Sequence, residues 1–525
     1  MKTFDKIRRN LANSVAEFLG HRAAPPVPSI SKKTRRRILV IGGGPVGLTF
    51  ALTLYDLARD HVEITVADGR WKLDGGNVSW KDSAEGVNRR QQVVTVQSLV
   101  FNRMPPIVRA AVFPEGGYGE IWPHGRESPA ELGFPRNIRI VDVEDRLLAL
   151  ARESGLHLLP ERLDPAVMIV ADWDLIVIAD GANSRTREHF RSAFGNSDSS
   201  QYSLNGRQIA DSVLGLRVRT SLSSSASVVL TIAQQRFLFN GLGDGRGLLY
   251  MRLTDEEALE VRGRVPGEHE FRPCIQSNPC QMTWHADRSK EIFICSKRRS
   301  IFVPATDPAS FLWPRVRAGL KLFGISDDSL ETLTIFPLSM TRRGAFSAEL
   351  TPVGSQHRVF GALIGDAAGV THFWPGRGLN RGLSSAHALA VVVSRANPGS
   401  RLRSADLTEF EGVMAQLQSR HQDRAWRAMV QMHDGEVTPV KTMIARTIAG
   451  PRPDRQKVVR EMQIRLAGLS SGLQDRLPSP ADLTELFSAL DNADDETLAV
   501  LCATGAWETL GSGGAEVDVN AVLRA

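Results

Sequence analysis

The chain has 525 residues, of which 42% are hydrophobic and 23% are charged. This composition is that of an ordinary globular protein with about two or three domains, and it excludes a fibrous or disordered chain. Lysine and arginine number 64 against 58 aspartates and glutamates, so the net charge is +6. Because no long basic run alternates with aromatic residues, we expect no nucleic-acid partner.

The cysteines and the apolar runs bear on the cellular setting. Cys274, Cys280, Cys295 and Cys502 are too few and too irregularly spaced for a disulfide framework, which favours a reduced, cytoplasmic location. Zinc binding by the first three together with His285 is a weaker alternative, because the chain lacks a C-x2-C pair. No apolar run approaches the ~18 residues of a membrane span, so no transmembrane segment is predicted.

Residues 1–34 are predicted to form an amphipathic helix followed by a linker. Phe4, Leu11 and Phe18 lie at helical spacing, and the stretch "APPVPSISKK" then interrupts the pattern. Acidic residues on the polar face favour a helix that docks on the protein, with a weak membrane-surface association as the alternative.

The first strong motif is "RRRILVIGGGPVGLTFALTLYDLARDHVEITVADGR". It contains an apolar strand, a G-x-G-x-x-G turn, a helix, a second strand and an aspartate 26 positions after the first glycine. The glycines permit a tight turn and close backbone approach to a pyrophosphate, and the acid suits ribose hydroxyls. The predicted dinucleotide-binding residues here are Gly42, Gly44, Pro45, Val46, Gly47, Asp68 and Arg70.

Two further motifs follow in order. "DLIVIADGANSRTREHF" carries Asp180, Gly181 and Arg187 after an apolar strand, and "GDAAGVTHFWPGRGLNRGL" carries an acid followed by glycines at a helix start. From about Arg35 to Ala390 the three motifs resemble the class A flavoprotein monooxygenases, the single-component FAD hydroxylases. The resemblance implies further FAD contacts at Gly365, Asp366, Gly378, Leu379 and Asn380.

The resemblance also implies a reaction. Asp366 would bind the ribitol of FAD, the backbone of 378–380 would meet the pyrimidine end of the flavin, and 180–187 would lie near the pyrophosphate and the nicotinamide donor. NADPH or NADH would reduce the flavin, O2 would form a C4a-hydroperoxide, and one oxygen atom would pass to the substrate. The chain has no second G-x-G-x-x-G, which is typical of enzymes in this class.

The third motif departs from most of the class. Gly369 stands where a histidine is usual, and "FWPGRG" is similar to the MICAL branch, as is "GVNRRQQVV", which places Arg90 and Gln91 at flavin-facing positions. His372, Trp374 and Arg90 are the candidate catalytic residues, and Pro375 is a further cofactor-binding candidate. A hydrogen-bonded wall residue is the alternative for His372, and packing between domains is the alternative for Trp374.

The expected fold class is α/β, with a discontinuous Rossmann-like FAD-binding domain, a mixed β-sheet substrate domain and a C-terminal helical segment. Among the expected strands are "SVVLTIA" and the two arms of a hairpin around "GLGDGRG". The expected boundaries are 35–105, 140–200 and 335–400 for the FAD-binding domain, 106–139 and 205–334 for the substrate domain, and 403–525 for the helical segment.

The preferred function is an NAD(P)H-dependent FAD monooxygenase acting on a small aromatic or polycyclic metabolite, with a protein methionine or a carrier-bound group as second choice. A reductase or dehydrogenase of the same fold and a non-catalytic FAD-binding subunit remain as alternatives. A flavin halogenase is disfavoured because no W-x-W-x-I-P segment is present.

Overall fold

The computed structural model describes residues 35–82, 84–87, 89–121, 133–264, 282–284, 292–295, 299–372, 378–397, 400–433, 435–472, 480–505 and 517–523. The predicted N-terminal helix lies outside these residues, as do Trp374, Pro375 and the cysteines and histidine of the zinc alternative other than Cys295. Among the helices in these ranges, none is both long and apolar enough to cross a bilayer.

The first sheet has six strands in the order β20-β21-β9-β1-β2-β8. The strands from β21 to β8 pair in parallel, and β20 joins the edge antiparallel. Every residue of β9 is buried, as expected for a parallel strand covered on both faces. The α/β class predicted from the sequence is therefore confirmed. The strands are β1 (Arg36–Ile41), β2 (Val62–Ala67), β8 (His157–Leu159), β9 (Leu175–Ile178), β20 (Ser347–Glu349) and β21 (Phe360–Leu363).

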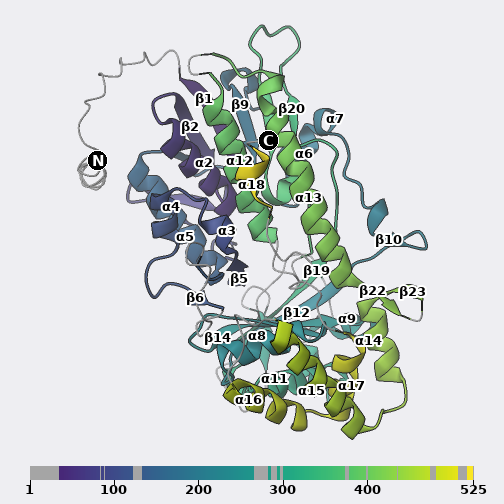
Figure 1. Cartoon of the computed structure of the whole chain (residues 1–525). Helices are drawn as coiled ribbons and strands as arrows, with labels where there is room; N and C mark the ends of the chain where they lie inside the picture. Colours follow the sequence, from purple (N-terminus) through teal and green to yellow (C-terminus); the bar gives the residue numbers. More distant parts are fainter. Residues whose placement is uncertain are drawn as a thin grey trace, which may run out of the picture.

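Helices α2 (Pro45–Ala58) and α12 (Gly378–Arg395) pack against each other beside this sheet (Figure 1). Their close approach depends on Gly382, because a Cβ at this position would lie 2.6 Å from Cγ2 of Val46. Helix α5 (Ile140–Ser154) packs on α2 as well.

The second sheet has eight strands in the order β13-β14-β12-β19-β16-β17-β18-β15. Every pairing among its described strands is antiparallel, so the expectation of a mixed sheet was wrong. The predicted glycine-rich hairpin joins β13 to β14, and such a tight turn permits only antiparallel pairing. The strands are β12 (Asp211–Arg219), β13 (Phe237–Gly241), β14 (Arg246–Leu253), β15 (Gly263–Arg264), β16 (Met282–Trp284), β17 (Phe293–Cys295), β18 (Ile301–Phe302) and β19 (Thr332–Leu338).

The segment "SVVLTIA" was expected as a strand, and the structure shows instead the helix α8 (Ser224–Ile232). The Ser223 hydroxyl accepts a hydrogen bond from the Ala226 N–H and caps the helix. Val229 and Leu230 are fully buried in the core of the second sheet, and this tertiary burial outweighs the strand preference of β-branched residues.

A small third sheet has the order β5-β7-β6 and joins β5 (Val93–Val96), β7 (Arg136–Arg139) and β6 (Gly119–Glu120). Helix α4 (Pro106–Val112) lies between β5 and β6 in the chain and packs on α2 and α5. Val108 and Val112 are buried in the core of the first sheet. This apolar face places α4 with the first sheet, whereas the sequence interpretation assigned 106–139 to the substrate domain.

The C-terminal helices separate into two groups. Helices α15 (Arg455–Gly472), α16 (Pro480–Asp491) and α17 (Asp495–Ala503) contribute to the core of the second sheet, and α14 (Val440–Ala449) packs on α17. Helix α18 (Val519–Val522) instead contacts α12 and α13 (Thr408–Met429) beside the first sheet (Figure 1). The described chain end at 517–523 therefore returns to the first sheet.

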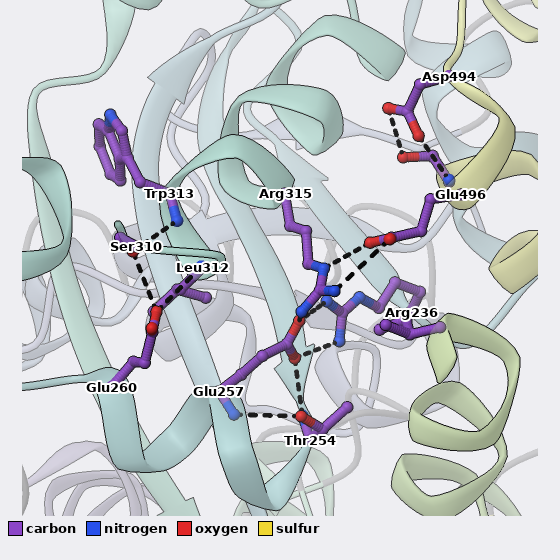
Figure 2. A network of polar contacts seen from close by, with 12 residues as sticks. Arg236, Thr254, Glu257, Glu260, Ser310, Leu312, Trp313, Arg315, Asp494 and Glu496 are labelled. Atoms are coloured by element: carbon purple, nitrogen blue, oxygen red, sulfur yellow. Dashed lines mark hydrogen bonds and ion pairs between the residues drawn. The ribbon is translucent and has the colours of Figure 1, made fainter. Parts of the chain in front are cut away.

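A buried ion-pair network attaches the C-terminal helices to the second sheet (Figure 2). Arg236 and Glu257 are 3% and 0% exposed, and Arg236 Nη2 lies 2.7 Å from Glu257 Oε1. Arg315 on α11 (Leu312–Leu322) donates to Glu257 at 3.3 Å and also to Glu496 on α17. The backbone N–H of Thr254 donates to Glu257 at 2.8 Å, so the buried carboxylate has several donors.

We predict that Glu257→Gln lowers the free energy of unfolding by about 3–5 kcal/mol, because it leaves Arg236 buried without its counter-charge. Asp255→Asn on the same helix, α9 (Asp255–Glu260), is the matched control. The side chain of Asp255 is 80% exposed in its ion pair with Lys441, and the expected loss is under about 1 kcal/mol. Urea unfolding at neutral pH compares the two, and equal losses would contradict the prediction.

The pH dependence of stability gives a second readout for Glu257. Burial alone would raise the pKa of Glu257, but Arg236 and the other donors outweigh burial, and the pKa is lowered. Its contribution is fully present above the ordinary glutamate value of about 4.3 and is lost as pH falls through the lowered value. The variant Glu257→Gln should therefore lose less stability on acidification than the native chain.

Candidate functional site

The three motifs meet at one edge of the first sheet. Gly42 follows β1 directly, Asp180 follows β9 by two residues, and Gly365 follows β21 by two residues. Because these strands are parallel neighbours, their carboxyl ends lie at the same edge. This edge is where ligands bind in open α/β sheets.

The glycines of the first motif have different tasks. Gly42 has φ +108°, and a Cβ there would lie 2.4 Å from the carbonyl oxygen of Ala179. A Cβ on Gly47 would lie 1.9 Å from the carbonyl oxygen of Gly42. Gly44 is more open, since the nearest atom to its Cβ position is Arg70 Nη2 at 3.3 Å. Packing therefore requires Gly42 and Gly47, and Gly44 is the position that a ligand can approach.

Gly44 is also the N-cap of α2, with Pro45 as its first residue. No side chain caps this helix terminus. Backbone N–H groups in the first turn have no partner within the helix, and the helix dipole favours an anion there. The turn from Gly44 to Gly47, including Val46, is therefore suited to a phosphate group.

Sequence reasoning missed the pairing of Gly43 with Trp71. A Cβ on Gly43 would lie 2.0 Å from the ring of Trp71, which is fully buried. Gly43, the second of three consecutive glycines, was the available signal in the sequence. The position of the indole, however, depends on where β3 (Trp71–Asp74) lies in the fold.

The Asp68 carboxylate accepts backbone hydrogen bonds that fix the glycine-rich turn after β1. Its Oδ2 accepts the Gly43 N–H at 2.8 Å, and its Oδ1 accepts the Arg70 N–H at 2.8 Å. The Arg70 guanidinium lies 2.7 Å from Asp68 and 3.1 Å from Glu144 on α5. The Arg70 side chain also donates from Nε to Oδ1 at 3.1 Å and from Nη2 to Oδ2 at 2.7 Å. A carboxylate has about four acceptor positions, and these four donors occupy them, so a hydrogen bond from Asp68 to a ribose hydroxyl stays a prediction. Glu144 was missed because an acid on an amphipathic helix carries no local signal.

The second motif is held by its own side chains. The hydroxyl of Ser184 accepts the Arg187 N–H at 2.9 Å and caps α6 (Arg185–His189). Gly181 has φ +92°, which favours glycine at this turn. The Asp180 Oδ2 accepts a hydrogen bond from Thr186 at 3.1 Å, whereas its buried Oδ1 has no partner in the described ranges.

Arg187 connects the second motif to the third. Its guanidinium donates to the carbonyl of Ala182 at 2.9 Å and to the carbonyl of Ala367 at 3.1 Å. Burial lowers the pKa of Arg187. The predicted cofactor-binding role of Arg187 stays a prediction, since the contacts here show a side chain that fixes two loops relative to each other.

The third motif packs directly on the first. Gly365 has φ +61°, and a Cβ there would lie 3.2 Å from Val46. Asp366 sits in the short turn η7 (Gly365–Ala368), partly exposed, and its carboxylate accepts no hydrogen bond from the described residues. An acid at a ligand edge without an internal partner is suited to binding a polyol.

Arg381 was not among the predicted site residues. It is fully buried and donates to the carbonyl of Gly365 at 3.0 Å and to the carbonyl of Gly369. Burial lowers the pKa of Arg381, and the charge of Asp366 opposes that shift. Arg381 therefore closes the loop that presents Asp366.

Asn380 ties the start of α12 to β5. Its Nδ2 donates to the Thr95 carbonyl at 2.7 Å, and its Oδ1 accepts the Gln97 N–H at 2.8 Å. The amide is thus used for positioning, while Gly378 and Leu379 at the helix start are only partly buried. Contact of their backbone with a ligand stays a prediction.

His372 is buried at the junction with the second sheet. Its Nε2 lies 3.1 Å from Oδ2 of Asp211, and both side chains are 0% exposed. Arg252 lies 3.2 Å from the same carboxylate and donates to the carbonyl of Ala428 on α13. Burial lowers the pKa of His372 despite the nearby carboxylate, which favours a neutral imidazole donating from Nε2. A catalytic role for His372 stays a prediction.

The structure does not bring Arg90 to the three motifs by any contact among the described residues. Its side chain is exposed, and its carbonyl accepts the Val141 N–H at 3.0 Å. Gln91 is half-buried beside it. Their predicted roles, like those of Trp374 and Pro375, are not tested by the described geometry.

This edge of the sheet thus brings together a helix N-terminus suited to phosphate, the turn of Asp68 and the turn of Asp366. Within the described part of the chain, Asp180 Oδ1 and the Asp366 carboxylate accept no hydrogen bond, and Gly44 is open to approach, which fits a dinucleotide with a polyol chain. The fold is therefore of the α/β class, and this edge of the first sheet is a candidate dinucleotide site.

Comparison with known proteins narrows this class. Over 164 residues the chain is 34% identical to 3-hydroxy-4-methyl-anthranilyl-[aryl-carrier protein] 5-monooxygenase from Streptosporangium sibiricum, a match that spans 30% of this chain and 42% of that protein. The chain therefore matches less than half of the length of this curated relative. No family model matches the chain. The chain resembles the class A flavoprotein monooxygenases, as its motifs predict, and the MICAL-like features stay a prediction.

Similar solved structures include the tetrameric form of 2-methyl-3-hydroxypyridine-5-carboxylic acid oxygenase, at 16% identity and a TM-score of 0.42, covering 74% of this chain and 91% of that one. CtdE in complex with FAD is 10% identical with a TM-score of 0.40, covering 75% of this chain and 93% of that one. At such TM-scores the similarity carries no conclusion about activity.

The glycine contacts predict that one of two neighbouring substitutions lowers stability and the other lowers ligand affinity. Gly43→Ala should lower the free energy of unfolding by about 1–3 kcal/mol, because the new methyl group overlaps the Trp71 ring. Gly44→Ala should leave stability nearly unchanged and weaken FAD binding, because its methyl group occupies the ligand approach. Urea unfolding and fluorescence titration with FAD measure the two effects. Tight FAD binding by Gly44→Ala would show that the ligand does not approach this turn.

Proposed function

We propose that the chain is an FAD-dependent monooxygenase that uses NADPH or NADH and O2 to oxygenate a small aromatic substrate. The observation that carries the proposal is the meeting of three motifs at one sheet edge, where the Asp366 carboxylate accepts no hydrogen bond from the residues that the structure describes. The similarity to a curated monooxygenase supports the reaction class.

In this proposal the first sheet forms a Rossmann-like FAD-binding domain. The N–H groups at the start of α2 bind the pyrophosphate, and Asp68 accepts hydrogen bonds from the adenosine ribose. Asp366 accepts hydrogen bonds from the ribitol chain. The N-terminus of α12 points its positive dipole end at the pyrimidine end of the flavin, where it stabilises negative charge.

Bound FAD supplies electron transfer from the nicotinamide donor and reaction with O2. The side chains of the protein would hold the binding loops in position and exclude water from the flavin ring. Arg187 and Arg381 hold the loops that carry Asp180 and Asp366. The His372–Asp211 pair, together with Arg252, joins the third motif to the second sheet, which would cover the reacting ring and exclude water.

The substrate class is proposed from the relative. Its name specifies a hydroxy-methyl-anthranilyl group on an aryl-carrier protein, an aromatic acid in carrier-bound form. A free aromatic metabolite is the first choice for this chain, and a carrier-bound aromatic acid is the second. Assays with a free aromatic acid and with its pantetheine thioester distinguish the two.

Oxygen transfer is tested with isotopically labelled O2. With a suitable aromatic substrate and NADPH or NADH, one labelled oxygen atom should appear in the product by mass spectrometry. Trp374→Ala should increase hydrogen peroxide release per nicotinamide oxidised, if the indole excludes water from the ring. Oxidation of substrate without label would instead support the dehydrogenase alternative. Flavin binding without reduction by either donor would support a non-catalytic subunit.

Asp366→Ala should weaken FAD binding about 10- to 100-fold, because the ribitol hydroxyls lose a charged acceptor worth about 1.5–3 kcal/mol. The fold should be retained, since the carboxylate has no hydrogen bond within the described protein to lose. Asp60→Ala, an exposed acid just after α2, is the control for the loss of one negative charge. Fluorescence titration of the apoprotein with FAD measures the affinity, and an unchanged value for Asp366→Ala would remove this residue from the site.

A further inference from the structure

A cleft of about 570 Å³ opens between β4 (Asn77–Trp80) and α5. The turns of the three motifs do not line it. Its lining combines three arginines and the carboxylate of Asp145 with an apolar floor that includes Leu148 and Ala149. The arginines are Arg89, Arg146 and Arg152.

The cleft lies next to the phosphate-binding turn of the first motif. The Trp80 ring lines it, and the guanidiniums of Arg70 and Arg89 lie 4.9 Å and 4.5 Å from the centre of this ring. Arg70 in turn reaches the Gly44 position, with Nη2 at 3.3 Å from where a Cβ would stand. Trp80 and Arg70 thus form a continuous series of contacts from the cleft to that turn.

The charge of the cleft is positive after its ion pairs are assigned. Arg89 is neutralised by Glu144 at 3.2 Å and Asp145 at 2.6 Å. Arg146 donates to the carbonyl oxygen of Val112 at 2.7 Å, and Arg152 donates to the carbonyl oxygen of Val78 at 3.2 Å. Neither Arg146 nor Arg152 forms an ion pair with a carboxylate of the described residues. Arg146 also donates to the carbonyl oxygen of Gly117 at 3.1 Å. The remaining N–H groups of Arg146 and those of Arg152 are therefore available to an anion.

Three further donors around the cleft have no hydrogen-bond partner among the described residues. They are the Ser79 hydroxyl, the Trp80 indole N–H and the Arg89 Nε–H, all of them buried atoms. Because these atoms are buried, they are not exposed to the open cleft, and an occupant would contact the exposed parts of the same side chains instead.

We infer that this cleft binds the phosphorylated adenosine end of the nicotinamide donor, so that the chain prefers NADPH to NADH. A phosphomonoester on the ribose matches the available N–H groups of Arg146 and Arg152, because arginine binds phosphate through charge-assisted, paired hydrogen bonds. The apolar floor suits the adenine ring, and the volume lies within the range of small-molecule sites. This inference rests on the proposed function, since it concerns the donor for the same flavin.

The test uses Arg152→Gln in the full chain and adenosine 2′,5′-bisphosphate as the probe. Arg152 is exposed on α5, so its loss should leave the fold intact. Arg460→Gln, an exposed arginine on α15, is the control for the loss of one positive charge. Calorimetry should show about tenfold weaker binding of the bisphosphate to Arg152→Gln only. The KM for NADPH should rise by a similar factor, with the KM for NADH unchanged.

Several outcomes would overturn the inference. One is an absence of bisphosphate binding to the native chain, and another is equal binding to both variants. A third is an equal loss of affinity for adenosine 5′-monophosphate, which would show that the cleft does not select the 2′-phosphate. Failure of the proposed function looks different, because the flavin would then not be reduced by either donor while bisphosphate binding and its loss in Arg152→Gln would persist.

Discussion

The close contact of α2 with α12 is the constraint on which the site depends. Val46 at the start of α2 lies against Gly365 and Gly382, and a side chain at either glycine would overlap it. This contact brings the turn after β1 and the turn after β21 together, although more than 300 residues separate them. The start of α2, which is suited to a phosphate, and the acid of the third motif could contact one extended ligand only because these backbones lie close together.

Buried arginines fix the conformation of the loops at this contact. Arg381 donates to two carbonyls of the third motif, and Arg187 spans the second and third motifs. In both cases an always-charged group is desolvated to satisfy loop carbonyls, which rigid loops at a sheet edge need because they lack ladder hydrogen bonds. Asp366 accepts no hydrogen bond from the described residues, as the proposed ligand role requires. The shape of the proposed site is thus set by side chains that need not touch a ligand themselves.

Two buried charge networks relate the second sheet to its neighbours. Asp211, flanked by His372 and Arg252, connects it to the third motif and to α13, which Figure 1 shows running from the first sheet to the second. Glu257 and its arginines connect it to α17 (Figure 2). Buried ion pairs are costly to break, so these connections restrict how the second sheet can move over the site.

The sequence by itself determined the α/β class and the strand-and-turn form of the three motifs, because each motif combines an apolar run with glycines or acids at fixed local spacing. That these turns face a ligand stays a prediction. The prediction of a strand at α8 was wrong. Its β-branched residues favour a strand, but their burial in the core of the second sheet stabilises a helix. Only the tertiary structure decided that Gly43 must accommodate Trp71 and that Arg381 closes the loop of Asp366. It alone also placed His372 in a buried pair. Such contacts join residues far apart in the chain, and local spacing carries no information about which distant side chain will fill a given space.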